Sequence, residues 1–137
     1  MTRCNMKLIK NEKLLNTFMM LIFPKTCLYE TYSVLKCLDL IKCYFDVVLS
    51  NNKKLPGDFH YNYFYIGIRC ILESNHSYLL QKMLAIIYKF YNIFADDFKE
   101  MINNYILNKV FFQLFMHWCQ DVRNIFHLLL FFKVLEF

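Results

Sequence analysis

The chain of 137 residues is 58% hydrophobic, 19% aromatic and 20% charged, which is too apolar for an intrinsically disordered protein and long enough for one domain with a core. Its formal net charge of +5 arises within residues 1–54, but no run of Lys and Arg resembles a nucleic-acid-binding stripe, so a nucleic-acid partner is not expected. Two glycines and two prolines are too few for a protein built from tight β-hairpins, so we predict a single all-α domain over residues 1–137.

The first third of the chain is predicted to form two helices followed by a loop. Hydrophobic residues recur at helical spacing through residues 6–23 and again through residues 26–49. Pro24 ends the first of these helices, and Thr26 is placed to cap the second. Residues 50–58, Ser-Asn-Asn-Lys-Lys-Leu-Pro-Gly-Asp, have the composition of a loop.

Two further helices are predicted in the middle of the chain. The tyrosines within residues 59–73 alternate as they would in a strand, but the all-helical context favours a helix. Either Ser74 or Asn75 is placed to cap the next helix, which runs to about Phe94. Because apolar residues cover most of its surface, we expect this helix to be buried on more than one side.

The last third of the chain is predicted to contain three shorter helices. One aspartate of the pair at 96–97 is placed to cap the first of them, and Asn108 is placed to cap the second, over residues 110–117. A polar corner at residues 117–121 then precedes a very apolar last helix over residues 122–135.

Short joins between these helices predict antiparallel neighbours, and two architectures remain open. One is a HEAT/armadillo-like α-solenoid segment, and the other is a compact helical bundle. A weak internal repeat favours the solenoid: Ile71 aligns with Leu114 and Met83 with Phe126, a separation of about 43 residues, which lies in the range of about 40–47 residues for HEAT and armadillo units.

The polar corner contains Asp121-Val122-Arg123, which resembles the turn of a HEAT repeat. In such a turn an aspartate closes the connection between helices and a following basic residue ties the turn to its neighbour. A carboxylate is favourable at a helix N-terminus, and a guanidinium can donate to several carbonyl groups. We therefore predict a structural turn formed by His117, Trp118, Asp121 and Arg123.

Residues that could carry chemistry are sparse. His117, Cys119 and His127 invite a metal or thiol site, but no third metal ligand accompanies the histidines. The sequence has no Gly-rich phosphate loop and no nucleophile elbow, and none of its six cysteines forms a C-x-x-C pair. We therefore expect no catalytic residues, no metal and no cofactor. Reduced cysteines without a secretory signal predict an intracellular, cytoplasmic protein that could associate with a membrane.

Segments 73–76, 79–88 and 117–129 resemble the closing region of an uncharacterised eukaryotic all-helical family. Its members are known only as a domain of unknown function, and some are described as predicted membrane proteins. The resemblance covers residues 71–134. It implies that this chain is a short relative or a fragment of a longer helical protein, and it implies no activity.

Two surfaces are predicted to meet partners. Leu128, Phe131, Phe132 and Leu135 lie on the outer face of the last helix, where they predict a protein partner or further helical repeats. We thus expect a non-catalytic scaffold or protein-interaction module. The alternative is a peripheral membrane module, in which basic residues of the first helix contact an anionic surface in a salt-dependent way. These basic residues are Lys7, Lys10 and Lys13.

Overall fold

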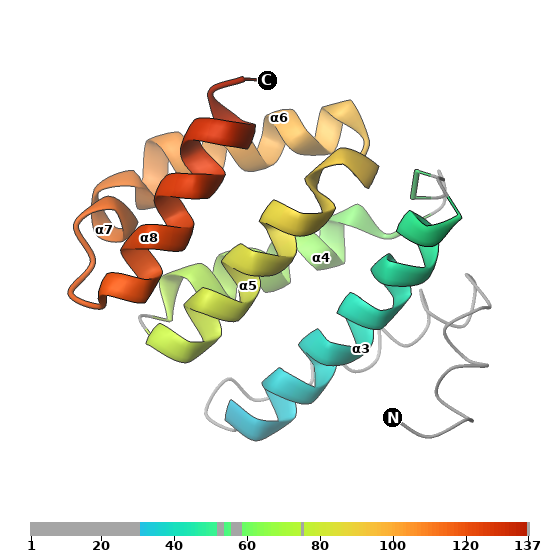
Figure 1. Cartoon of the computed structure of the whole chain (residues 1–137), viewed down its shortest axis with the longest axis horizontal. Helices are drawn as coiled ribbons and strands as arrows, with labels where there is room; N and C mark the ends of the chain where they lie inside the picture. Colours follow the sequence, from blue (N-terminus) through green and yellow to red (C-terminus); the bar gives the residue numbers. More distant parts are fainter. Residues whose placement is uncertain (1–30, 52–53, 56–58, 75, 137) are drawn as a thin grey trace. The chain divides into compact units, whose positions relative to one another are not determined.

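A computed structural model describes residues 31–51, 54–55, 59–74 and 76–136 of the chain (Figure 1). The helices of this part are α3 (Thr31–Ser50), α4 (Tyr61–Glu73), α5 (Ser77–Phe90), α6 (Asp96–Tyr105), α7 (Phe111–Phe115) and α8 (Gln120–Leu129), together with the short helical turns η1 (Tyr91–Ile93), η2 (Ile106–Val110) and η3 (Leu130–Val134). No β-strand occurs in these ranges, so the all-α class is confirmed and the strand considered for residues 59–73 is excluded. The helix predicted over residues 6–23 lies outside the described residues.

The chain divides into two compact units, residues 1–70 and residues 71–137. The division falls inside α4. The single domain expected over residues 1–137 and its α-solenoid or bundle arrangement stay predictions. The loop predicted at residues 50–58 falls between α3 and α4, partly outside the described residues.

In the first unit, α3 and the start of α4 are joined by an aromatic cluster around Phe45. The Phe45 side chain is fully buried. Its ring meets the edge of Phe64 at a centroid distance of 5.5 Å and that of Phe59 at 6.0 Å. Edge-to-face pairs of this kind add about 0.5–1.5 kcal/mol each to the stabilisation from burial. The periodic apolar residues of α3 therefore form part of a packed core.

The second unit is organised around α5, against which α8 packs (Figure 1). The buried side chains of α5 are Leu79, Leu80, Met83, Leu84, Ile86, Ile87 and Phe90. They lie on more than one side of the helix, as its pattern predicted. The predicted cap at Ser74 or Asn75 was wrong. His76 is the N-cap, because it stays extended and its imidazole Nδ1 accepts a hydrogen bond from the Leu79 N–H at 3.5 Å.

Two other predicted caps were also wrong. Ala95 is the N-cap of α6, and the two aspartates that follow it lie in the first helical turn, where their charge favours the positive end of the helix dipole. Asn108 does not begin a new helix, because α6 continues into α7 through the π-helical turn η2. The residues that suggested these caps are polar residues that a helix also accommodates inside its turns. The two aspartates lie in the first turn of α6, and Asn108 lies in the middle of the continuous helix.

The π-helical turns correct the register of the buried residues. Ile106, Val110 and Leu114 are buried at intervals of four, and on a regular α-helix each such step would rotate the side chain by about 40° away from the core. A π-turn takes in one extra residue and removes this drift. The same occurs in η3, where the Leu135 N–H donates to the Leu130 carbonyl, five residues earlier, at 2.9 Å.

Candidate functional site

The corner between α7 and α8 is tied together by Arg123. Its Nη1 donates to the His117 carbonyl at 2.6 Å and to the Trp118 carbonyl at 3.3 Å. The His117 side chain is buried, and its Nδ1 accepts a hydrogen bond from the Cys119 N–H at 3.1 Å. The guanidinium and the imidazole therefore satisfy backbone groups that the turn leaves outside the helices.

The four residues predicted to form the turn take different roles there. His117 and Arg123 make the contacts just described, whereas Trp118 contributes its carbonyl and leaves its indole 71% exposed. Asp121 is exposed in the first turn of α8, whose N-cap is Cys119. Its carboxylate can therefore interact favourably with the positive end of the α8 dipole, but it is not an acceptor in the two Arg123 hydrogen bonds described above. The likeness to a HEAT repeat stays a prediction.

The possible thiol or metal site does not assemble around this corner. Nδ1 of His117 is occupied by a backbone N–H, and Sγ of Cys119 accepts from Gln81 Nε2 at 3.7 Å. His127 lies between the rings of Phe115 and Phe131 instead. Burial lowers the pKa of His117, and the positive charge of Arg123 lowers it further. Across the described ranges, no group of three or more His, Cys, Asp or Glu side chains could hold a metal ion.

An uninterrupted row of rings runs from α7 onto α8. Phe111 contacts Phe112 and stacks on Phe115, each at a centroid distance of 5.3 Å. Phe115 contacts His127 at 4.6 Å, and His127 contacts Phe131 at 6.4 Å. We call these five residues the aromatic strip. Its middle is half-buried, and its two ends, Phe112 and Phe131, are exposed.

Rows of exposed apolar side chains continue both ends of the aromatic strip. The first row follows the continuous helix from η2 to the end of α7 by about one turn at a time, and the second follows α8 and η3 at helical spacing. All of these side chains are between 41% and 78% exposed. We call them the apolar face. Its members are Leu107, Phe112 and Met116 in the first row, and Leu128, Phe131, Phe132 and Leu135 in the second.

The second row consists of the four residues that the sequence predicted as an interaction surface. All four are exposed, and their role in binding stays a prediction. The first row was missed. Its members are spaced by five residues and then by four, so an α-helical template places Leu107 and Phe112 on different sides. The residue types gave no signal for the π-turn, because apolar residues at intervals of four, such as Ile106, Val110 and Leu114, are equally ordinary on an α-helix.

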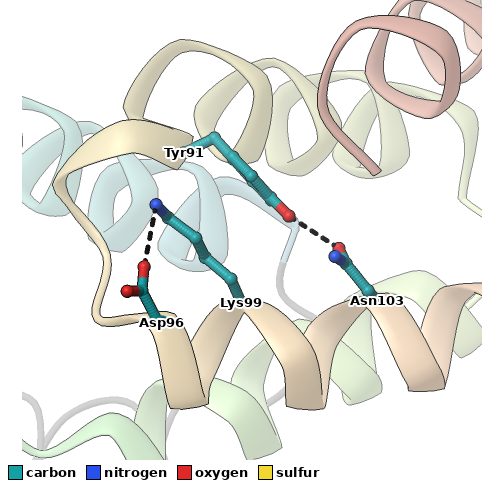
Figure 2. Close-up of polar contacts among 4 residues, drawn as sticks. All are labelled: Tyr91, Asp96, Lys99 and Asn103. Atoms are coloured by element: carbon teal, nitrogen blue, oxygen red, sulfur yellow. Dashed lines mark hydrogen bonds and ion pairs between the residues drawn. The ribbon is translucent and has the colours of Figure 1, made fainter. Parts of the chain in front are cut away.

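A second cluster, which is polar and buried, joins η1 to α6 (Figure 2). The Tyr91 hydroxyl donates to Asn103 Oδ1 at 2.9 Å. Nζ of Lys99 lies 3.4 Å from Asp96 Oδ1 and 5.5 Å from the centre of the Tyr91 ring. Tyr91, Lys99 and Asn103 are buried, whereas Asp96 is exposed. This arrangement satisfies the polar groups that accompany the chain reversal, so it explains the geometry without a ligand.

Replacing Tyr91 with phenylalanine is expected to lower the free energy of unfolding by about 1–2 kcal/mol, because Asn103 Oδ1 loses its donor in a buried place. Burial raises the pKa of Tyr91, and the nearby Asp96 carboxylate raises it further. The unfolded chain thus ionises first as pH rises, so the contribution of Tyr91 is complete below about pH 10 and is lost above it.

Urea denaturation of wild type and Tyr91→Phe at a series of pH values measures both effects. The difference between the two proteins should narrow above about pH 10. Tyr78→Phe is the matched control, because Tyr78 is exposed. A difference that stays constant or widens at high pH would contradict the assigned role of the hydroxyl.

The basic residues predicted to contact an anionic surface, Lys7, Lys10 and Lys13, lie outside the described residues. The membrane alternative therefore stays a prediction. Within the ranges that the structure describes, none of the helices combines the length and apolar character needed to cross a membrane.

The described helices thus present an exposed apolar face and a corner held by Arg123. The chain belongs to the family described as protein of unknown function (DUF1765), whose model matches residues 15–134. An uncharacterised family was expected, but the match reaches well beyond residues 71–134, to which the sequence resemblance was confined. No curated protein and no solved structure matches the chain.

Proposed function

We propose that this chain is a non-catalytic helical scaffold that binds a protein partner through the apolar face. The observation that carries the proposal is the exposure of seven large apolar side chains that flank one connected strip of rings. Phe112 is 78% exposed although it lies in a helix with a well-packed opposite side. Local folding does not require such exposure, so we assign the face to recognition.

The size of the apolar face supports the same proposal. Seven side chains that on average expose somewhat more than half of roughly 200 Å² each present about 800 Å² of apolar surface in total, divided between the two rows. The largest apolar patch on a typical monomer is about 300–600 Å². An apolar face of this size favours a protein partner or an additional helical repeat over contact with water.

Affinity purification of the full chain from cells that carry it tests the proposal. Wild type should retain a specific set of proteins that is lost when both Phe131 and Phe132 are replaced with serine. Ile66→Ser is the matched control, since Ile66 is also about half exposed but lies on α4. A retained protein should then bind the purified chain directly and fail to bind the double variant. Recovery of the same proteins with all three chains would contradict the proposal.

A further inference from the structure

We infer that the corner between α7 and α8 opens in acid, because the imidazole of His117 must be neutral to accept the hydrogen bond that holds the corner. The Cys119 N–H points at Nδ1 of this ring at a distance of 3.1 Å. An N–H donor needs a lone pair to accept it, so Nδ1 carries no proton here and the ring proton lies on Nε2. A second proton can add only at Nδ1, where it would face the Cys119 N–H and end the hydrogen bond.

This hydrogen bond lies at the start of α8. Cys119 is the N-cap of that helix, and its carbonyl accepts the Arg123 backbone N–H at 3.2 Å. The carbonyl of His117 accepts from Arg123 Nη1 at 2.6 Å. His117 therefore holds the first turn of α8 with its side chain and with its main chain, so a displaced imidazole disturbs both contacts.

The surroundings of the ring do not favour a positive charge. His117 is only 3% exposed, so an imidazolium there would lose most of its hydration. The charged residue beside it is Arg123, which has the same sign. Asp121 of α8 is exposed, and α7 contains no charged residue. From α5, the neutral amide of Gln81 donates to the Cys119 thiol at 3.7 Å. Acid therefore weakens the corner.

The direction of the pH dependence follows from the same surroundings. Burial lowers the pKa of His117, and the charge of Arg123 lowers it further. The unfolded chain thus binds the proton first as the pH falls. The stabilisation from the neutral ring is complete above about pH 6.5, the ordinary pKa of histidine, and is lost progressively below it.

His76 provides an internal contrast. Its Nδ1 also accepts a backbone N–H, from Leu79 at 3.5 Å, but the residue is exposed at the start of α5. Water can therefore solvate the protonated ring of His76, whereas His117 is enclosed. The acid response is expected at the corner and not at this cap.

The fluorescence of Trp118 measures the response. Trp118 is the only tryptophan of the chain, and its ring centre lies 5.3 Å from that of His117. Titration of the full chain from about pH 8 to about pH 4 should change this fluorescence with a midpoint below about pH 6.5. His117→Asn should remove the change, since its amide Oδ1 can accept the Cys119 N–H and does not titrate. His76→Asn and His127→Phe are the matched controls and should retain it. A change that persists in His117→Asn, or that is lost in either control, would overturn the inference.

NMR of the wild-type chain provides a test that needs no variant. Spectra that correlate the ring protons and nitrogens of His117 should place its proton on Nε2 at neutral pH. As the ring takes up its second proton, the Cys119 amide should lose its protection against hydrogen exchange. A proton on Nδ1 at neutral pH, or an amide that stays protected after the ring is charged, would overturn the inference.

The corner also joins the helices that carry the two rows of the apolar face, so its opening should release a partner bound there. This consequence rests on the proposed function, whereas the acid response itself does not. A partner retained through Phe131 and Phe132 should bind wild type less tightly at about pH 5 than at about pH 7.5, and His117→Asn equally at both. If the fluorescence and NMR results are as expected but no partner binds at either pH, only the proposed function fails. If a partner binds but Trp118 shows no acid response, only this inference fails.

Discussion

Replacing Phe126 with alanine is expected to lower the free energy of unfolding of the second unit by about 3–5 kcal/mol. The Phe126 side chain is fully buried on α8, and its ring meets Phe111 at a centroid distance of 6.2 Å. Truncation removes apolar contacts and leaves a cavity, since α8 and its neighbours can collapse only in part. A loss of this size is a large fraction of the total stability of a domain, which is about 5–15 kcal/mol.

Urea denaturation followed by circular dichroism measures this loss. Phe132→Ala is the matched control: it makes the same change in the neighbouring part of the same helical segment, where the side chain is about half exposed. We expect the control to change stability by no more than about 1 kcal/mol. Equal losses of unfolding free energy for the two variants would contradict the burial of Phe126 and the exposure of Phe132.

Replacing Arg123 with alanine is expected to lower the free energy of unfolding by about 1.5–3 kcal/mol, because the guanidinium donates to the carbonyl groups of two consecutive residues at the corner. Arg123→Lys should recover only part of the loss, since an ammonium group lacks the planar fork that reaches both carbonyls. Thermal unfolding measures both variants.

Asp121→Ala is the informative comparison for this corner. The Asp121 carboxylate is exposed in the first turn of α8, so its removal should cost only about 0.3–1 kcal/mol through the helix dipole. A larger loss for Asp121→Ala than for Arg123→Ala would show that the aspartate closes the turn, as the HEAT-like pattern suggested. The two variants therefore distinguish an arginine-held corner from that pattern.

The helices could be predicted from the sequence because their apolar periodicity is strong, and the corner at residues 117–121 could be predicted because polar residues interrupt it. The caps could not. Asp96, Asn108 and Ser74 are residues that cap helices in isolation, but a neighbouring residue, or a continuing helix, took each role here. Capping energies of about 1 kcal/mol are too small to decide where a helix with a large buried side begins.

In the candidate site, too, one part could be predicted from the sequence and another part could not. The row formed by Leu128, Phe131, Phe132 and Leu135 follows the ordinary helical repeat, so the sequence was sufficient to predict it. The row with Leu107, Phe112 and Met116 spans the π-turn η2, whose spacing an α-helical template does not reproduce. The contacts that Arg123 makes with two backbone carbonyls likewise required the folded corner, because no pattern of residue types shows where a carbonyl group will point.

The π-turns have a consequence for how this family tolerates changes in length. Each contains one residue more than a regular helix would need, so a single-residue deletion in η2 can be absorbed by closing the turn into an α-helix. Because the turn then loses only its extra residue, the side chains after it keep nearly the same side of the helix. A deletion at an α-helical position of the same segment would instead rotate every later side chain by about 100° about the helix axis. Such a deletion just before Phe112 would move Phe112 and Met116 to another side of the helix, although neither residue had been changed. The π-turn at Ile106–Val110 is therefore the place in this helix where the chain can lose one residue with the least effect on the side that Phe112 and Met116 occupy.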